Sequence, residues 1–410
     1  MSSESTFTSV DAGNAGGSDA RPGARVRPSS PHILSFDGYR DVAFLLVFLR
    51  HYTLTRHAHS PVIVAIAAVG AAGWAGVDLF FVLSGFLITG ILLDTRSDPH
   101  YFRNFIARRA LRIFPLYYTV LFGLLALTPL LHLQWHRGQI AYFFYFGNVA
   151  ANLNPLNENL LPYFSFLHLW SLSVEEQFYL LWPLIIYFAG TPGRVVRLCL
   201  GLSVFAFLVR GAILLWLPEG SAVEWCSAQL PTRMDGLLYG SIAAVLVRRF
   251  PLERILPHVK RTFWSVAVLL AGMYFVMGPN FHNYPMTLVG YPLLALFFTS
   301  LLLLALEPTS LFARFGQLRW LRTLGRYSYG LYVYHMIAGF AVAALLPWLQ
   351  ERTHSITVGG ILYTLAVFFG SLIFSVASYE LYERQFLRLK RYFPYGKDAP
   401  VSVEAAVSTA

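Results

Sequence analysis

The chain has 410 residues, of which 56% are hydrophobic and only 13% are charged, and its mean hydropathy is +0.54. A water-soluble fold cannot bury that much apolar surface, so the composition excludes an ordinary soluble domain and predicts an all-α, polytopic membrane helix bundle. The net charge of +10 does not indicate nucleic-acid binding, because the basic residues lie in short loops between apolar runs.

The two ends of the chain differ from its apolar centre. Residues 1–32 are rich in Ser, Gly, Ala and Arg and contain no apolar stretch of the signal-peptide type, so we expect a disordered cytoplasmic leader. Residues 394–410 are again small and polar, and we expect a flexible cytoplasmic tail. One transmembrane domain over residues 33–393 lies between them. Its two cysteines are too few for a disulfide framework or a thiolate metal site.

Ten apolar runs approach the length of about 20 residues that a membrane-spanning helix needs. They cover residues 34–54, 75–94, 112–131, 170–190, 197–217, 234–250, 262–279, 286–306, 326–348 and 357–382. With both termini in the cytoplasm, the inner segments carry most of the 31 basic residues, as the positive-inside rule requires. The runs at 61–73 and 141–149 are too short to count, and we expect the second to be interfacial or re-entrant.

The first predicted span carries Arg40 near its inner end and His51 near its outer end. Eleven residues at 100° each return to within about 20° of the same helix face and cover about 16 Å of the helix axis. Ionisable residues inside spans are costly and by default face the interior of the bundle. Arg40 and His51 are therefore predicted to line one stripe across much of the membrane.

The second predicted span begins with Asp78 and has Ser84 and Gly85 at mid-depth. Small residues at such positions commonly permit close helix packing. The alternative is that Ser84 and Gly85 leave room for a slender acyl chain.

Four arginines lead into the third predicted span: Arg103, Arg108, Arg109 and Arg112. Arg112 follows Arg109 by three residues and Arg108 by four. The spacing gives a basic helix face suited to phosphate groups, and Arg109 and Arg112 are our candidates. The alternative is contact with lipid headgroups under the positive-inside rule.

Carboxylates gather near the outer ends of the fourth and sixth predicted spans. The fourth opens with the candidates Glu175, Glu176, Tyr179 and Trp182, and the sixth with Arg233 and Asp235. By topology, Glu175 and Asp235 share the outer half of the membrane with His51. A histidine beside a carboxylate is a common general-base arrangement, because imidazole titrates near neutral pH and the carboxylate fixes its tautomer. Arg210, in the fifth span, either faces the bundle or extends to the interface.

The last two predicted spans add further polar groups. The ninth carries Ser328, Tyr329, Tyr332 and His335. His335 lies about 14 Å into the membrane from the inner end of its span, and the alternative to a functional role is a packing contact with another helix. Glu380 and Glu383 at the end of the tenth span are interpreted as partners of nearby arginines rather than as catalysts.

Six segments, in this order along the chain, resemble the motifs of the acyltransferase-3 family of membrane O-acyltransferases. They are DGYRDVAFLLVFLRHY, GVDLFFVLSGFLI, RRALRIFPLYY, WSLSVEEQFYLLWP, RMDGLLYG and LGRYSYGLYVYH. The resemblance implies a ten-helix protein of the bacterial inner membrane that moves an acyl group, usually acetyl, from cytoplasmic acetyl-CoA or another acyl-CoA to an acceptor hydroxyl. The family's Arg and His pair falls on Arg40 and His51, its glutamate on Glu175, and its basic pair on Arg109 and Arg112.

The sequence departs from the family pattern in two places. FDGYRD stands where LDGLRA is common, which makes Asp41 a candidate partner that weakens any phosphate contact of Arg40. Some members carry an appended extracytoplasmic hydrolase-like domain. The sequence shows no such domain, so we expect the whole reaction to occur in the bundle.

These features combine into one expected mechanism. The phosphates of acyl-CoA meet Arg40, Arg109 and Arg112, and further contacts with the donor come from Ser84, Tyr329 and His335. His51, oriented by Glu175 or Asp235, removes the proton of the acceptor hydroxyl, with a transient acyl-histidine as the second option. Acceptor contacts are assigned to Arg233, Tyr179 and Trp182.

The expected partners are acyl-CoA, membrane lipids and a hydroxyl acceptor, either a cell-surface polysaccharide or lipid-linked sugar or a small metabolite such as a macrolide. No metal is expected, since no spaced set of His and carboxylate ligands indicates one. The sequence does not indicate an oligomeric state. A transporter is the rival class, because charges inside spans serve transport too.

Overall fold

The computed structural model of the protein describes residues 33–52, 61–153, 159–161, 164–278 and 283–395. This part of the chain is mostly helical, with connecting turns and two short antiparallel strands, β1 (Asn159–Leu161) and β2 (Phe164–Ser165). The predicted all-α fold class is confirmed. The predicted leader, and the tail beyond residue 395, lie outside the described residues.

Each of the ten predicted spans coincides with a helix. These helices are α1 (Leu34–Tyr52), α3 (Gly76–Asp94), α4 (Tyr101–Ala126), α7 (Trp170–Ala189), α8 (Pro192–Trp216), α11 (Asp235–Arg249), α12 (Leu252–Met277), α13 (Tyr291–Leu304), α15 (Arg319–Ala341) and α17 (Ile356–Ser378).

Shorter helical segments connect or extend them. They are α2 (Pro61–Ala71), η1 (Gly73–Ala75), α5 (Thr128–Leu131), η2 (Arg137–Phe144), α6 (Gly147–Leu153), η4 (Leu167–Leu169), α9 (Glu219–Ala228), α10 (Leu230–Arg233), η5 (Met286–Gly290), α14 (Leu311–Gly316), α16 (Leu345–Thr353), η6 (Tyr379–Glu383), α18 (Arg384–Arg388) and η7 (Leu389–Tyr392).

Length and composition identify several of these helices as candidate membrane spans. Within the described residues, six helical stretches are long and apolar enough, and a seventh qualifies if α15 and α16, which meet at 65°, form one broken span. Outside this group lie α1 and α7, which carry the ionisable residues singled out above, and α11, which has only 15 residues. The multi-pass class is therefore confirmed, whereas the count of ten and the cytoplasmic termini stay predictions.

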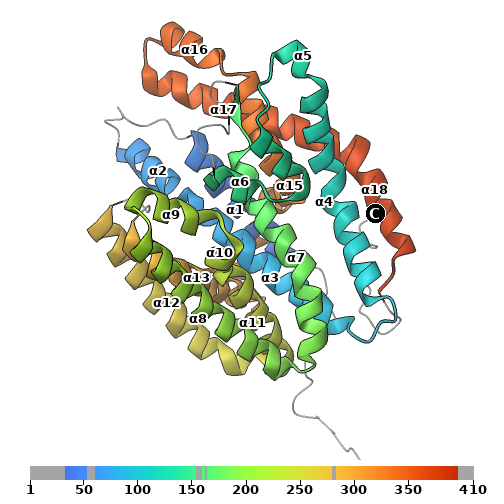
Figure 1. Ribbon diagram of the computed structural model, residues 1–410. Helices are drawn as coiled ribbons and strands as arrows, with labels where there is room; N and C mark the ends of the chain where they lie inside the picture. The colour runs from blue at the N-terminus through green and yellow to red at the C-terminus, as the bar shows by residue number, and fades with distance from the viewer. Residues whose placement is uncertain (1–32, 53–60, 154–158, 162–163, 279–282, 396–410) are drawn as a thin grey trace, which may run out of the picture.

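Helix α3 lies at the centre of the bundle. It packs against α1, α7, α11 and α13. In its apolar 18-residue stretch 72% is buried, compared with 17% in the corresponding stretches of α8 and α12. Figure 1 shows α1 and α3 running through the middle, with α8, α11, α12 and α13 on one side and α4, α15 and α17 on the other. Helices α8 and α12 therefore leave more of their apolar surface exposed than α3 does.

The short apolar run at 141–149 is broken into pieces, η2 and α6, neither of which is long enough to span a bilayer. Tyrosines of α4 hold η2 in place: the hydroxyl of Tyr117 donates to the carbonyl of Tyr142 at 2.7 Å, and that of Tyr118 donates to Phe143 at 2.9 Å. The run at 61–73 begins with α2, which has 11 residues and is also too short.

Glycines bring α3 and α11 into direct backbone contact. A Cβ atom on Gly85 would collide with the carbonyl oxygen of Leu237, and one on Gly240 would collide with that of Val82. At the C-terminal ends of the same helices, Arg248 donates to both carboxylate oxygens of Asp94, at 2.9 and 2.7 Å. The space beside Gly85 is therefore filled by α11. The packing alternative is confirmed for Gly85, whereas the contact of Ser84 with the donor stays a prediction.

We expect Gly85→Ala to lower the stability of the protein by about 1–3 kcal/mol, because the added methyl group forces α3 away from α11. Thermal unfolding of the detergent-solubilised protein measures this effect. Gly201→Ala on α8 is the matched control, since nothing lies within 4 Å of its added Cβ, and it should be neutral or slightly stabilising. An unchanged melting temperature in Gly85→Ala would contradict the close approach.

Candidate active site

Two histidines from distant parts of the chain meet between α1 and α15. Nδ1 of His51, on α1, lies 2.9 Å from Nε2 of His335, on α15. The ring planes differ by 16° and the centroids are 5.1 Å apart. That separation is close to the largest that two imidazoles joined at 2.9 Å can have, so the rings point edge to edge along the hydrogen bond. His51 is exposed, whereas His335 is 0% exposed.

Neighbouring helices hold this histidine pair. Nδ1 of His335 lies 2.6 Å from the carbonyl oxygen of Tyr332, one turn earlier on α15. The hydroxyl of Tyr52 donates to the carbonyl of His335 at 2.8 Å, which ties the last turn of α1 to α15. The hydroxyl of Tyr332 donates to the carbonyl of His168 at 2.5 Å, and the rings of His168 and His335 are 5.1 Å apart.

A second cluster surrounds Glu175 of α7. Ser84 donates to one carboxylate oxygen at 2.8 Å, and Tyr179 donates to the other at 3.2 Å and to Ser84 at 2.9 Å. Arg109 and Arg40 lie close enough to Glu175 to interact with it electrostatically. Arg109 interacts with Glu176 in the same way. Both glutamates are half-buried. Glu175 is therefore held between α7, its own helix, and Ser84 of α3.

The arginines of α1 and α4 differ in how far the protein already uses them. Arg108 is buried and donates to the carbonyls of Lys390 and Phe393, so it fixes the end of the chain that follows η7. Arg109 and Arg112 are half-buried. The charge of Arg112 acts on Glu383 of η6.

Arg40 is paired with Asp37, its neighbour one turn earlier on α1, at 2.8 Å. Residues adjacent in sequence do not face each other on a helix. Asp41 is accordingly fully buried on another face, and its carboxylate oxygens have no hydrogen-bond partner among the described residues. The expectation that Asp41 pairs with Arg40 is wrong.

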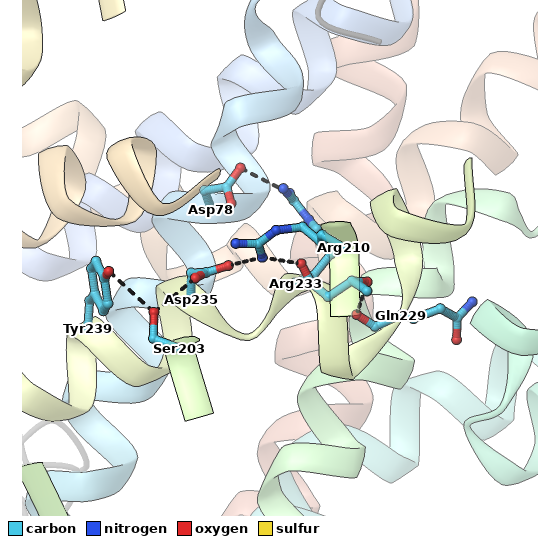
Figure 2. A network of polar contacts seen from close by, with 8 residues as sticks. Asp78, Ser203, Arg210, Gln229, Arg233, Asp235 and Tyr239 are labelled. Carbon is cyan, nitrogen blue, oxygen red and sulfur yellow. Dashed lines mark hydrogen bonds and ion pairs between the residues drawn. The ribbon is translucent and has the colours of Figure 1, made fainter. Parts of the chain in front are cut away.

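A network of buried charges joins α8, α10, α11 and α3, as Figure 2 shows. Arg210 donates to Asp235 at 2.5 Å and to the carbonyl of Thr232 at 2.7 Å, and Ser203 donates to the second oxygen of Asp235 at 3.2 Å. Arg210 is 0% exposed, so it faces the bundle. The prediction that Asp235 orients His51 conflicts with this geometry, because the carboxylate is already bound to Arg210.

The second ion pair of the network is formed by Arg233 and Asp78, at 3.0 Å. The guanidinium of Arg233 lies 3.8 Å from the ring centroid of Tyr291 on α13, a favourable cation–π contact. Arg233 is only 3% exposed. Arg233 therefore contributes to packing inside the bundle, and its assignment to acceptor binding stays a prediction.

Residues 33–380 match the acyltransferase domain of the acyltransferase-3 family. The chain belongs to this family. It is 30% identical over 294 residues to the O-acetyltransferase OatA of Staphylococcus aureus, an alignment that covers 65% of this chain and 46% of that protein.

A second relative of this acyltransferase-3 protein is the peptidoglycan O-acetyltransferase OatA of Listeria monocytogenes. It is 27% identical over 326 residues, which cover 76% of this chain and 50% of that protein. The chain thus spans about half the length of the curated relatives that it matches. No solved structure matches it.

Three more of the predicted site residues of this acyltransferase-3 protein are already engaged in packing. Trp182 is 1% exposed and its indole N–H donates to Thr89 at 2.7 Å, which places it inside the bundle rather than on a surface for the acceptor. The hydroxyl of Tyr329 donates to the carbonyl of Ile113 at 2.7 Å, which joins α15 to α4. Nε2 of His335 lies 2.9 Å from Nδ1 of His51, and its predicted contact with the donor stays a prediction.

The interpretation of Glu380 as an arginine partner is confirmed. It pairs with Arg384 at 3.0 Å and with Arg326 at 3.5 Å. Among the described residues, no group of three or more His, Cys, Asp or Glu side chains is arranged to hold a metal ion.

Sequence reasoning missed His168 and the role of Tyr332 in this site. His168 lies in η4, directly before α7, and its carbonyl accepts from Tyr332. Tyr332 and Ser171, which share a hydrogen bond of 2.6 Å, connect the histidines to the first turn of the helix that carries Glu175. The available signal was the three-residue spacing of Tyr332 and His335, which places both on adjacent turns of one helix face.

Proposed function

We propose that this protein is a membrane O-acetyltransferase that moves an acetyl group from acyl-CoA on the cytoplasmic side of the bacterial inner membrane to a hydroxyl of a cell-wall polysaccharide. Membership of the acyltransferase-3 family supports the reaction type. The names of the two relatives, one of them a peptidoglycan O-acetyltransferase, support the acceptor class. The observation that carries the proposal is the exposed His51 in the last turn of the helix that also holds Arg40.

The donor site of the proposal is formed by arginines that reach the interior of the bundle. Arg40, Arg109 and Arg112 are half-buried, and acyl-CoA offers phosphates to which guanidinium groups bind in a bidentate manner. Arg40 and Arg109 both interact electrostatically with Glu175. The phosphates of acyl-CoA would therefore share these two arginines with the Glu175 carboxylate. The slender pantetheine arm then extends along α1 toward His51.

The chemistry assigns one step to His51. Its Nε2 has no hydrogen-bond partner among the described residues and the side chain is exposed, so an acceptor hydroxyl can reach it. In the proposed step, Nε2 takes the hydroxyl proton while the oxygen attacks the thioester carbon. The carbon–sulfur bond breaks, and the leaving thiolate takes the proton from Nε2. The acceptor gains an acetyl ester and coenzyme A leaves as a thiol.

Acetyl-CoA labelled in the acetyl group tests the proposal directly. We expect inside-out membrane vesicles that contain the protein to transfer label to polysaccharide supplied in their lumen, as an ester that mild alkali releases. Vesicles from cells without the protein are the control. Right-side-out vesicles should use only donor that is sealed inside them.

Absence of transfer with any acyl-CoA would contradict the proposal. Uptake of an unmodified solute without a donor would instead support the transporter reading. Transfer to a small hydroxyl metabolite, with polysaccharide left unlabelled, would retain the reaction type and overturn the acceptor.

A further inference from the structure

The contacts of His51 and His335 determine which nitrogen of each imidazole ring carries a hydrogen. The carbonyl oxygen of Tyr332 can only accept a hydrogen bond, and Nδ1 of His335 lies 2.6 Å from it. Nδ1 of His335 therefore carries a hydrogen. In a neutral imidazole the other nitrogen, Nε2, then has a lone pair and accepts.

The neutral form of His335 follows from its surroundings. The side chain is 0% exposed and its ring neighbours are aromatic: Phe44, Tyr52 and Tyr332 have centroids 6.1, 6.3 and 5.7 Å away. A charge buried among such groups is costly unless it is paired. The histidines 51 and 168 also face this ring, and a positive charge on His335 would repel a proton on either of them.

The assignment then passes to His51. Because Nε2 of His335 accepts, Nδ1 of His51 at 2.9 Å must donate. The remaining nitrogen of His51, Nε2, has the lone pair, and it belongs to an exposed side chain. A histidine that is free to choose would carry its hydrogen on either nitrogen.

We propose that His335 is a positioning residue that fixes the Nδ1–H tautomer of His51 and aims its Nε2 at the acceptor hydroxyl. In the known arrangement of a base histidine, a carboxylate performs this task. Here a neutral histidine, locked by a backbone carbonyl, takes the place that we had predicted for Glu175 or Asp235. His335 itself is sealed from substrate and acts only through His51.

Hydrogen bonds between three helices hold the pair of His51 and His335 rigidly. The backbone carbonyl of His335 accepts from Tyr52, the residue next to His51, so a second hydrogen bond joins the two helices beside the imidazole contact. The carbonyl of Tyr52 accepts from Thr364 of α17 at 2.8 Å, which adds a third helix. The distance between the two rings is thus set by three helices and not by side-chain rotation alone.

The first experiment rests on the proposed transferase function and measures labelled acetyl transfer by His335 variants. We expect His335→Leu to lower kcat by about 10- to 100-fold, as loss of a supporting hydrogen bond commonly does, with KM for the donor unchanged. His335→Gln should recover most of this loss, because its side-chain oxygen can accept from Nδ1 of His51. In a His51→Ala background, His335→Leu should have no further effect.

A purely structural role predicts a different pattern. His335→Gln and His335→Leu would then be equally impaired, would lower the melting temperature equally, and would multiply the loss caused by His51→Ala. That pattern would overturn the proposal. The wild-type rate is the internal reference, since a wild-type protein without transfer activity contradicts the proposed function and leaves the tautomer to the next measurement.

The second experiment needs no activity. In protein labelled with ¹⁵N-histidine, the chemical shifts of the ring nitrogens report which one carries the hydrogen, and the spectrum of His51→Ala identifies the signals of His51. We expect His51 to be the Nδ1–H tautomer in the wild type and to shift toward Nε2–H in His335→Leu. Finding the Nε2–H tautomer in the wild type would overturn the proposal even if acetyl transfer is normal.

Discussion

Membranes that carry His51→Ala are expected to transfer acetyl groups about 10²- to 10⁴-fold more slowly than wild-type membranes, the range that a positioned general base contributes. The methyl group of alanine cannot accept the hydroxyl proton. His335, the hydrogen-bond partner of His51, is 0% exposed and cannot take over the role. The rate of ester formation from labelled acetyl-CoA, at saturating donor, measures the loss.

Two controls make this result specific. His258→Ala removes an exposed histidine of α12 and should leave the rate unchanged. Because His51→Ala also leaves Nε2 of buried His335 without its donor, at a cost of about 1–3 kcal/mol, the melting temperature of the variant must be measured beside its rate. A folded variant with undiminished transfer would remove His51 from the mechanism. Label trapped covalently on wild-type protein but absent from the variant would favour the acyl-histidine route over direct attack.

The sequence predicted the helices well because hydropathy is a local property. Each apolar run formed a helix, and Arg40 and His51 share α1 as their spacing indicated. The pairing of His51 with His335 joins residues 284 positions apart. Such a contact depends on which faces of α1 and α15 pack together, and neither composition nor periodicity determines that.

The carboxylates show why charge inside a span was a weaker guide to function than to fold. Asp235 and Asp78 are matched by Arg210 and Arg233, so the four charges neutralise one another inside the bundle. The sequence correctly placed Asp235 on a helix but could not distinguish His51 from Arg210 as its partner. Glu175 differs, because neutral hydroxyls of Ser84 and Tyr179 bind it and it keeps a half-buried surface.

We expect Asp235→Ala to destabilise the protein by about 3–5 kcal/mol, the usual effect of removing one partner of a buried ion pair. The variant leaves the guanidinium of Arg210, which is 0% exposed, without its carboxylate. Thermal unfolding in detergent and the yield of folded protein measure this loss. Asp37→Ala, which opens the more exposed pair with Arg40, is the control and should cost no more than about 1 kcal/mol.

The double variant Arg210→Met with Asp235→Leu separates a structural role for Asp235 from the catalytic role that its topology suggested. Replacing both partners of a buried ion pair with apolar residues of similar volume is often neutral or stabilising, so this variant should regain the stability that Asp235→Ala loses. If the ion pair serves packing, the double variant also regains acetyl transfer, because His335 still fixes His51. A stable double variant without transfer activity would instead return Asp235 to the reaction.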